Sequence, residues 1–347
     1  MKERKADHID ICINENVTAG YCYWDDVKLI HEALPEVNAD DIDMSANVLG
    51  KKLKFPFIVT AITGGFSGAS KINANIAEAC AELGVGMGVG SQRAAVEKID
   101  KKSYAVIKDY DVPLVIGNIG APQLVKQKKK NAFTSDMVGE AIELIGADVM
   151  AVHLNFLQEV AQPEGDTNAC GCFDAIRGLS RKYPIMVKET GAGISSKTAK
   201  RLSGIGIKAI DIAGKGGTSF AAVEMYRASA KNDDVRAAVG RTFSDWGIPS
   251  TVSLMSVNTD IPVIASGGIK NGMHAAVSIA LGACCAGSAN LILKDAMVSS
   301  EAVKKRLTIV REEMRAAMML TGSKNIKALG AADKVILGRT KEWMDAL

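Results

Sequence analysis

The sequence predicts an α/β protein with the (β/α)8 or TIM-barrel fold and an N-terminal extension. Three observations lead to this prediction: short apolar runs recur along the chain, a helical pattern follows most of them, and polar or glycine-rich residues stand directly after nearly every run. The runs are continuously apolar, which is typical of parallel strands that helices cover. About eight such strand–helix units close into a barrel.

The predicted strands are rich in β-branched or small apolar residues and occupy residues 57–61, 85–89, 113–118, 148–154, 184–189, 209–213, 262–266 and 284–288. Helical spacing of apolar residues predicts helices over 72–83, 135–145, 173–182, 197–202, 272–281 and 299–320. Residues 1–50 precede the first strand, and we expect them to pack as an N-terminal cap or to reach over the barrel mouth. No Pro- or Ser-rich linker divides the chain, so we expect 1–347 to be a single domain with the barrel and the C-terminal helices in 51–347.

A doubly wound sheet is the alternative fold, because glycines at every second position from 84 to 90 resemble a dinucleotide fingerprint. These glycines lie within the second predicted strand, whereas the fingerprint occupies a turn between a strand and a helix. No acidic strand end follows at the expected distance of about 20 residues. We expect the small residues to make room for a flat ligand above the barrel.

Composition excludes several classes of protein. With 48% hydrophobic and 23% charged residues, the chain is an ordinary globular protein. A formal net charge of only +3 argues against a protein that coats nucleic acid. We also expect no membrane association and a cytoplasmic location, because the sequence contains neither a signal-peptide core nor an apolar stretch of about 18 residues.

The cysteines are predicted to be reduced thiols of the interior. Their number, 7, is odd, and they are spread over the whole chain. Cys170 and Cys172 are the pair closest to a metal-binding pattern, but tetrahedral zinc normally requires a different spacing and a second pair. We therefore predict no metal at this pair.

Active sites of barrels lie at the carboxyl ends of the strands, so the residues that follow each apolar run are candidates by position. Glycine-rich loops after the seventh and eighth strands are the usual phosphate site, and Gly267, Gly268, Ser288 and Ala289 fit it. Each loop alone is compatible with simple turn chemistry. With Thr218 in a third glycine-rich loop after the sixth strand, phosphate binding is the favoured interpretation.

Lys188 lies inside an apolar strand and requires an anionic or electron-rich partner, such as a flavin ring. A salt bridge to Glu189 or Asp211 is the alternative. At the end of the fourth strand, a group of polar residues suits a diphosphate and a divalent cation, with Glu159 as the oxygen ligand that Mg²⁺ prefers. The group consists of His153, Asn155, Gln158 and Glu159.

Several strings together resemble the type 2 isopentenyl-diphosphate isomerases, from residue 4 to about residue 330. They are Arg4-Lys5 with His8, 63–65 (Thr-Gly-Gly), 90–93 (Gly-Ser-Gln-Arg), 153–159 (His-x-Asn-x-x-Gln-Glu), 162–166 (Gln-Pro-Glu-Gly-Asp), 188–189 (Lys-Glu), 216–219 (Gly-Gly-Thr-Ser) and 245–249 (Asp-Trp-Gly-Ile-Pro). On composition alone, the basic start would be a solvated tail. The strings at 90–93 and 153–159 are the more specific ones.

The resemblance implies an enzyme that interconverts isopentenyl and dimethylallyl diphosphate with reduced FMN, NADPH as reductant and Mg²⁺. It implies a flavin site formed by Ala61, Ile62, Thr63, Ser91, Asn118, Lys188, Thr218, Gly267, Gly268, Ser288 and Ala289. It implies substrate binding by Arg4, Lys5, Ser91, Arg93, His153, Asn155 and Gln158, metal at Glu159, and catalytic roles for His153, Gln158 and Glu224. It also implies a homo-oligomer, a tetramer or an octamer.

The sequence departs from the pattern of the resembled family at two positions, and two other functions are alternatives to the one that the family implies. Phe220 stands where the family commonly has an indole, and Lys215 adds a charge to a glycine loop. Residues 220–246 are long for a barrel loop and are a candidate mobile lid, with a surface helix as the alternative. An FMN-dependent oxidoreductase is disfavoured, because His274 is placed on a helix and 214–220 holds no cysteine. A non-catalytic flavin- or phosphate-binding barrel would not need the second group of anion-binding residues.

Overall fold

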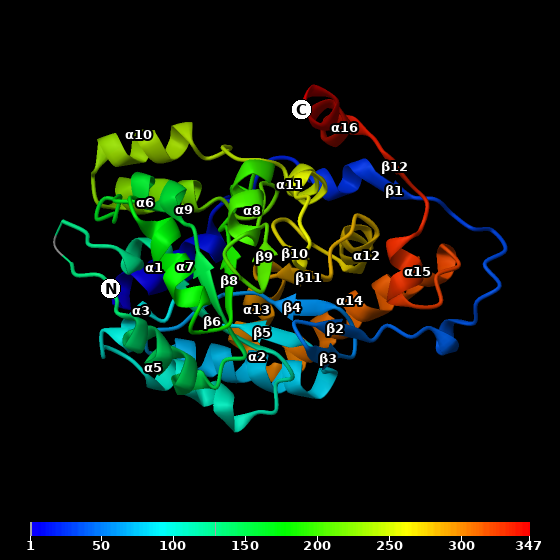
Figure 1. Ribbon diagram of the computed structural model, residues 1–347, viewed down its shortest axis with the longest axis horizontal. Helices are drawn as coiled ribbons and strands as arrows, with labels where there is room; N and C mark the ends of the chain where they lie inside the picture. Colours follow the sequence, from blue (N-terminus) through cyan, green and yellow to red (C-terminus); the bar gives the residue numbers. More distant parts are fainter. Residues whose placement is uncertain (1, 129) are drawn as a thin grey trace.

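Eight parallel strands close into a barrel at the centre of the molecule, which confirms the predicted fold (Figure 1). The structure is a computed structural model that describes residues 2–128 and 130–347, with side chains from Lys5 onward. The strands follow one another around the barrel in chain order, and the last pairs with the first. They are β4 (Phe57–Val59), β5 (Gly86–Gly88), β6 (Val115–Gly120), β7 (Val149–His153), β8 (Ile185–Lys188), β9 (Ala209–Asp211), β10 (Val263–Ala265) and β11 (Cys285–Ser288).

Each predicted apolar run overlaps one barrel strand. Seven strands are shorter than their runs, because the residues at the ends of each run leave the sheet and enter the loops, whereas β6 extends two residues beyond the predicted run 113–118. Every residue of β4, β5, β9 and β10 is buried. This is the reason why the runs are continuously apolar: one face of each strand fills the barrel and the other packs under helices.

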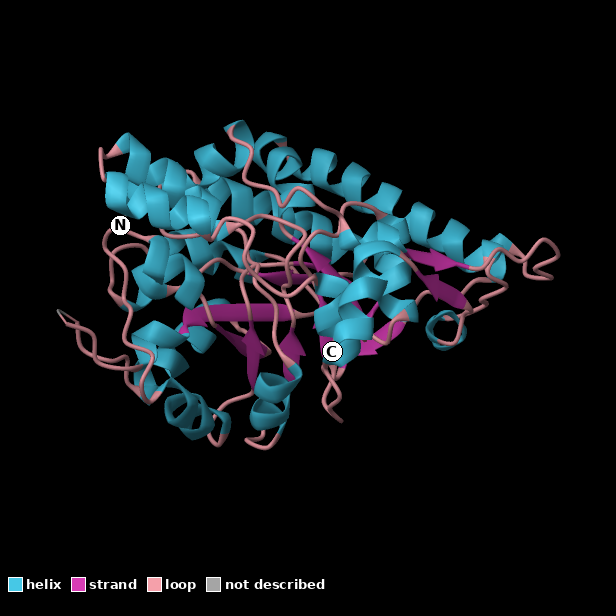
Figure 2. Ribbon diagram, turned by 90° about the horizontal axis from the view of Figure 1, so that it is seen from above, coloured by secondary structure: helices cyan, strands magenta, loops and turns pink. Residues whose placement is uncertain are grey.

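The helices surround the barrel on the outside (Figures 1 and 2). The six predicted helices correspond to α2 (Ala69–Leu83), α5 (Ser135–Ile145), α7 (Cys172–Ser180), α8 (Ser196–Ser203), α12 (Gly272–Ala280) and α14 (Ser300–Leu320). Further helical segments are α3 (Arg93–Val96), α4 (Lys102–Ala105), η3 (Val106–Asp109), η4 (Ala121–Leu124), α6 (Phe156–Ala161), α11 (Ser250–Ser256), α13 (Asn290–Val298) and α15 (Ile326–Gly330). Most of these are short and lie at the strand ends, where loop residues rather than apolar spacing determine the structure.

The long segment after β9 folds into two helices that pack on each other, α9 (Phe220–Ala230) and α10 (Asp234–Thr242). The surface-helix alternative describes its secondary structure, and mobility of the segment stays a prediction. Helical periodicity is weak in α9 because its buried residues are mainly small, or charged like Glu224 and Arg227. A pattern search based on large apolar residues does not detect such a helix.

The N-terminal extension reaches both ends of the barrel. Its elements are α1 (Lys2–Asn14), η1 (Tyr23–Asp26), β1 (Val27–Leu29), η2 (Ala39–Asp41), β2 (Ala46–Val48) and β3 (Lys51–Leu53). The antiparallel β2–β3 pair places Val48 and Leu53 in one buried cluster with barrel residues such as Ile58 and Ile264. This hairpin therefore closes the end of the barrel opposite the mouth, whereas α1 lies at the mouth.

A part of the N-terminal extension pairs with the C-terminal segment outside the barrel. Strand β1 pairs antiparallel with β12 (Lys334–Ile336), and α16 (Gly338–Ala346) packs against η1. The buried carboxylate of Asp26 accepts hydrogen bonds from Tyr21 Oη (2.5 Å) and from the backbone N–H of Thr340 (2.8 Å). These contacts fix η1 against α16. Among the residues described, none of the helices has the length and apolar character that crossing a bilayer requires.

Candidate active site

A cavity of about 420 Å³ opens at the carboxyl ends of the barrel strands. All eight strands contribute to its wall through their last residues or the loops that follow, and α1 contributes Lys5, His8, Ile9 and Cys12. The volume falls in the range of about 300–1,000 Å³ typical of small-molecule sites. The position is the one at which barrels build their active sites.

The residues expected to hold a flavin all line this cavity. They are Ala61, Ile62, Thr63, Ser91, Asn118, Lys188, Thr218, Gly267, Gly268, Ser288 and Ala289. They come from seven different loops or strand ends that the sequence separates by up to 228 positions, from 61 to 289. The barrel brings them together because parallel strands present their carboxyl ends on one side.

A cradle of glycines forms one side of the cavity. Gly267 and Gly268 have φ angles of 90° and 80°, a left-handed conformation that favours glycine. A Cβ atom on Gly217 would lie 2.6 Å from the backbone nitrogen of Gly268, so the two loops touch through their backbones. Such a side-chain-free surface suits a phosphate group, which needs close approach to the backbone.

Lys188 lies in the cavity wall at the end of β8. Its Nζ donates to the carbonyl oxygen of Glu189 at 2.7 Å, and no ion pair joins it to Glu189 or Asp211 among the described residues. Burial raises the pKa of Glu189 to about 7, against hydrogen bonds from three backbone N–H groups. Burial likewise raises the pKa of Asp211, partly offset by Lys188. Lys188 therefore keeps donor capacity toward a ligand in the cavity, which is what a flavin ring requires.

His153 is buried at the end of β7 beside Asn118. Its Nδ1 lies 2.7 Å from Asn118 Oδ1, and Asn118 Nδ2 donates to the carbonyl oxygen of Val89 at 3.0 Å. Since Asn118 Oδ1 is an acceptor, Nδ1 carries the proton and Nε2 is the free acceptor of the neutral ring. Burial first, and then the charges of Lys188 and Lys5, lower the pKa of His153 to about 3.

Glu159 forms an oxygen-rich corner with Asn155 at the start of α6. Its carboxylate accepts from Asn155 Nδ2 at 2.9 Å and from the backbone N–H of Asp166 at 2.7 Å. Asn155 Oδ1 is buried and has no hydrogen-bond partner among the described residues. A buried orphan oxygen beside a carboxylate in a cavity wall fits a hard cation such as Mg²⁺.

Glu224 lies directly behind the cavity wall and is completely buried. Its Oε1 accepts from Gln158 Nε2 at 2.9 Å and lies 2.8 Å from His8 Nε2, and Arg227 forms an ion pair with Oε2. Burial raises the pKa of Glu224, but the hydrogen bond and charge of His8, followed by Arg227 and Gln158, lower it to about 2. The group is therefore a buried carboxylate one hydrogen bond away from a cavity residue.

The basic residues of the predicted substrate site are already partnered within the protein. Lys5 Nζ donates to the carbonyl oxygen of Ser91 and to Tyr104 Oη, both at 2.7 Å. Arg93 forms ion pairs with Glu97 and with Asp166, both at 2.8 Å. Lys5 and Arg93 both line the cavity. The side chain of Arg4 lies outside the described residues.

Sequence reasoning gave no role to several residues of this site. Tyr104, Arg227, Ile9 and Cys12 belong to it through the contacts above or through the cavity wall. The signal that was available for α1 is spacing: 5, 8, 9 and 12 follow the i, i+3, i+4, i+7 pattern of one helix face. The roles of Tyr104 and Arg227 depend on contacts distant in sequence, which no local pattern reveals.

Comparison with known proteins places this site in a family. A family model described as FMN-dependent dehydrogenase matches residues 4–152 and 166–335. Among solved structures, a mandelate oxidase variant with a C4a-OH-FMN adduct superposes with a TM-score of 0.63 at 16% identity, over 97% of this chain and 99% of that chain. A flavocytochrome b2 variant gives a TM-score of 0.64 at 16% identity, over 98% and 84%. The chain is thus an FMN-dependent α/β-barrel enzyme.

The similarity to curated sequences is much higher and more specific. The isopentenyl-diphosphate delta-isomerase of Thermoplasma acidophilum is 48% identical over 345 residues, 99% of both chains. That of Archaeoglobus fulgidus is 43% identical over 348 residues, 99% of this chain and 98% of the other. The chain therefore belongs to the isopentenyl-diphosphate delta-isomerases, in their FMN-dependent type 2 form.

Proposed function

We propose that the protein interconverts isopentenyl and dimethylallyl diphosphate by protonation and deprotonation in isoprenoid biosynthesis. The observation that supports this most strongly is that one cavity is lined both by a glycine cradle and by a separate group of basic and polar residues. The glycine cradle with Lys188 suits a flavin phosphate and ring, while Lys5 and Arg93 stand beside the oxygen-rich corner of Glu159. A barrel that only bound flavin would need the first site alone.

FMN would be held by the eleven cavity residues named above, of which Ala61 is the first and Ala289 the last in the sequence. When bound in its reduced form, FMN supplies an anionic ring that takes part in proton transfer, and NADPH is the proposed reductant. Lys188 would donate to the ring, and the loops around Gly268 and Ser288 would hold the phosphate. Since protonation of an alkene creates a cation that water would trap, the buried apolar wall serves to exclude water.

The diphosphate would be anchored away from the reacting carbons. Arg4, Lys5, Ser91, Arg93, His153, Asn155 and Gln158 are the proposed contacts. Charge-assisted hydrogen bonds contribute roughly 1.5–3 kcal/mol each, so a few of them hold a small substrate firmly. The negative charge of a diphosphate would favour the protonated form of the His153 ring. This anchoring energy can then be used to fix the alkene in a reactive position.

Mg²⁺ would bind at Glu159, with the buried oxygen of Asn155 as a second ligand from the protein. A divalent ion there would neutralise part of the diphosphate charge, and it would keep several water ligands, as Mg²⁺ usually does. The corner lies at the start of α6, next to Gln158. The metal would therefore orient the substrate relative to the residues that move protons.

Gln158 and Glu224 are the proposed proton relay, with His153 as a further catalytic candidate. Gln158 lines the cavity and donates to Glu224, whose carboxylate is ionised at neutral pH. The amide of Gln158 connects the cavity to the carboxylate of Glu224 through this hydrogen bond. The carboxylate supplies a negative charge that stabilises the positive charge of the transition state.

The direct test is anaerobic incubation of the protein with FMN, NADPH, Mg²⁺ and isopentenyl diphosphate, with NMR detection of dimethylallyl diphosphate. We expect product only when the flavin is reduced, and no consumption of NADPH in proportion to product. Proportional consumption of NADPH would support the FMN-dependent oxidoreductase instead. Tight flavin binding without product would support a non-catalytic barrel.

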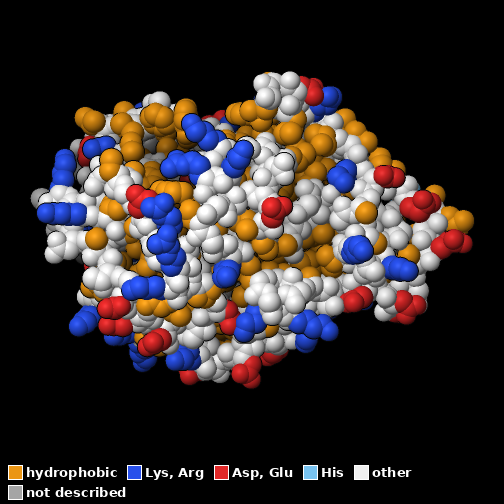
Figure 3. All heavy atoms as spheres, viewed as in Figure 1, with side chains coloured by type: hydrophobic (Ala, Val, Ile, Leu, Met, Phe, Trp, Pro, Cys, Tyr) orange, Lys and Arg blue, Asp and Glu red, His pale blue; other side chains and the backbone are white. Residues whose placement is uncertain are grey.

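We also propose that the protein works in the cytoplasm as a homo-oligomer, a tetramer or an octamer, without nucleic-acid or membrane partners. All seven cysteines lie in the described residues and are free thiols, as expected in a reducing compartment, but Cys170 is exposed, so the prediction that all of them lie in the interior is wrong for this residue. Apolar side chains are exposed over α10, at the upper left of Figure 3, where Val235 is 73% exposed. Sedimentation at several protein concentrations tests the assembly, and a monomer at all concentrations would contradict it.

A further inference from the structure

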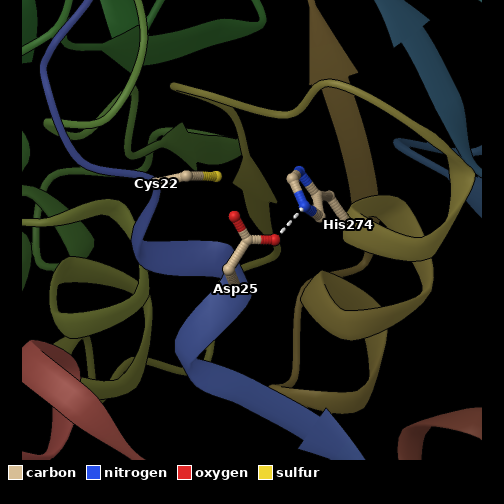
Figure 4. A group of neighbouring side chains, drawn as sticks. All are labelled: Cys22, Asp25 and His274. Atoms are coloured by element: carbon tan, nitrogen blue, oxygen red, sulfur yellow. Dashed lines mark hydrogen bonds and ion pairs between the residues drawn. The ribbon is translucent and has the colours of Figure 1, made fainter.

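A cluster of three side chains outside the cavity connects the N-terminal extension to the barrel. Cys22 directly precedes η1, Asp25 lies within η1, and His274 comes from the first turn of α12 (Figure 4). Their sulfur, oxygen and nitrogen atoms all lie within 4.8 Å of one another. His274 is buried, whereas the side chain of Asp25 is 63% exposed.

The hydrogen bonds of His274 argue against a metal ion in this cluster. The backbone N–H of Lys270 donates to His274 Nδ1 at 3.3 Å, so Nδ1 is the acceptor and Nε2 carries the proton of the neutral ring. Nε2 then donates to Asp25 Oδ1 at 2.9 Å. A metal bound at Nε2 would require a proton on Nδ1, which would point at the N–H of Lys270. Metal-ligating histidines instead donate from their second nitrogen to an acceptor.

The thiol of Cys22 lies beside the carboxylate of Asp25. Burial, followed by the negative charge of Asp25, raises the pKa of the Cys22 thiol, which favours its protonated form. Partial burial raises the pKa of Asp25, but hydrogen bonds from His274 and Cys22 hold it below its ordinary value. Asp25 is therefore a carboxylate that accepts a hydrogen bond from His274, and the cluster contains a hydrogen-bond relay from the backbone N–H of Lys270 through His274 to Asp25.

The backbone that the relay reaches belongs to the glycine cradle. Gly267, Gly268, Ile269 and Lys270 all line the cavity. Trp24, which precedes Asp25 in η1, is buried and donates from Nε1 to the carbonyl oxygen of Gly267 at 2.8 Å. Two adjacent residues of η1, Trp24 and Asp25, thus hold the two ends of the loop 267–270, one directly and one through His274.

This loop needs support from outside because two of its residues have no side chain. Ser250 Oγ donates to the carbonyl oxygen of Gly267 at 2.7 Å, and Ser288 Oγ donates to that of Ile269 at 2.9 Å. Among the contacts described here, the N–H of Lys270 is held by His274. In a free loop, both glycines would populate many backbone conformations besides the one with positive φ. Contacts with neighbouring residues must therefore hold the loop in its observed conformation.

We propose that η1 is a buttress of the cofactor-phosphate loop, and that Trp24, Asp25 and His274 are positioning residues for a phosphomonoester group in the cradle. The inference rests on the proposed function only in placing the FMN phosphate at residues 267–270. The buttress acts on the phosphate end of the cofactor and not on its ring, because its contacts end at the loop backbone. Its effect must therefore depend on whether the flavin carries a phosphate.

The test compares FMN with riboflavin, which lacks the phosphate, on the full-length protein in the oxidised state. Binding is followed by flavin fluorescence for the wild type, Asp25→Ala, Asp25→Asn and the control Asp174→Ala. Asp174 is 68% exposed, pairs with Arg177 and does not line the cavity. We expect Asp25→Ala to weaken FMN binding by about three- to tenfold and riboflavin binding by less than about twofold, since one hydrogen bond is lost.

Asp25→Asn should restore most of the FMN affinity, because an amide oxygen still accepts from His274. Equal losses for both flavins would show a general structural effect and overturn the proposal, as would unchanged FMN binding in Asp25→Ala. If Zn²⁺ bound the wild type at micromolar concentration and this binding disappeared in Asp25→Ala, the cluster would be a metal site instead. None of these readouts depends on isomerase activity, so failure of the proposed reaction would leave the inference testable.

Discussion

The buried imidazole of His153 shows how the barrel sets the chemistry of one side chain. Its position at the end of β7 removes it from water, and two lysines at the cavity disfavour a positive charge. With Nδ1 donating to Asn118, the neutral ring offers Nε2 to the cavity. If the diphosphate binds beside this ring, as we propose, its negative charge would favour protonation and would couple substrate binding to proton uptake at His153.

Replacement of His153 by Gln should change how stability depends on pH. In the folded protein its pKa is about 3, against 6.5 ordinarily, so below pH 6.5 the unfolded state binds more protons. Stability is therefore lost as pH falls from about 6.5 toward 3, by up to about 1.4 kcal/mol per pH unit from this group. Urea unfolding at pH 7 and pH 5 should give a smaller difference for the variant. Equal differences in both proteins would contradict the shift.

Glu224→Gln should slow turnover by about 10²–10⁴-fold, the usual range for a lost proton-transfer group. The substitution keeps the shape of the side chain but removes the charge that Gln158 and His8 face. FMN affinity should be unchanged, because Glu224 does not line the cavity. Steady-state kinetics and flavin titration provide the two measurements. A variant with wild-type kcat would exclude Glu224 from the relay.

Glu159→Gln should abolish the Mg²⁺-dependent turnover, because an amide is a weaker ligand for a hard cation than a carboxylate. Flavin binding should stay as in the wild type. Glu140→Gln, on the exposed surface of α5, is the matched control and should behave as the wild type in both assays. An unchanged Mg²⁺ titration in Glu159→Gln would place the metal elsewhere.

At the scale of elements, α1 forms a wall of the cavity from a segment outside the barrel. Lys5 reaches the second strand loop at Ser91, and His8 reaches Glu224 in α9. Cys12 packs with Phe220 in a small apolar cluster of its own. The helix therefore bridges two sides of the mouth, and its stability depends on these tertiary contacts more than on its own sequence.

Removal of residues 2–14 should separate cofactor binding from catalysis. The glycine cradle and Lys188 belong to the barrel, so the shortened protein should still bind FMN within a few-fold of the wild-type affinity. Isomerisation should be lost, because Lys5 and the closed wall are missing. A double substitution, Lys5→Ala with His8→Ala, tests the same point in the full-length chain. Retained activity in both proteins would contradict the role of α1.

At the scale of the whole molecule, the cavity is a product of barrel closure. Its wall draws on all eight strands, so a ligand there connects segments from both halves of the chain. The closure of the opposite end by Val48 and Leu53 leaves the mouth as the open end of the barrel core. A cofactor that bridges so many strands must stabilise the fold as a whole.

FMN at one hundred times its Kd should therefore raise the free energy of unfolding by about 2.7 kcal/mol. This follows from mass action when only the folded state binds the ligand. Thermal unfolding at increasing FMN concentrations should show a Tm that rises with the logarithm of concentration above Kd. A Tm independent of FMN would mean that the folded chain does not bind it, and riboflavin at equal saturation provides a comparison without the phosphate.

The architecture and most of the candidate site are predictable from the sequence. Each of the eight apolar runs overlaps a strand, because burial on both faces leaves an uninterrupted apolar signal that needs no knowledge of the partners. The residues at strand ends converge because a closed parallel barrel allows no other arrangement. The apolar pattern did not give the bounds of helix α9, because its buried residues are three alanines, Val223, Glu224 and Arg227.

The amino-acid sequence by itself thus determined the barrel, the glycine-rich loops at the strand ends and the polar group of 153–159, because these depend on local pattern and on strand direction. Only the tertiary structure decided the charge states and partners. The ionised Glu224, the neutral His153 and the relay from Asp25 to Lys270 arise from contacts between residues far apart in sequence. Desolvation and hydrogen bonding act through space, so no local sequence pattern encodes them.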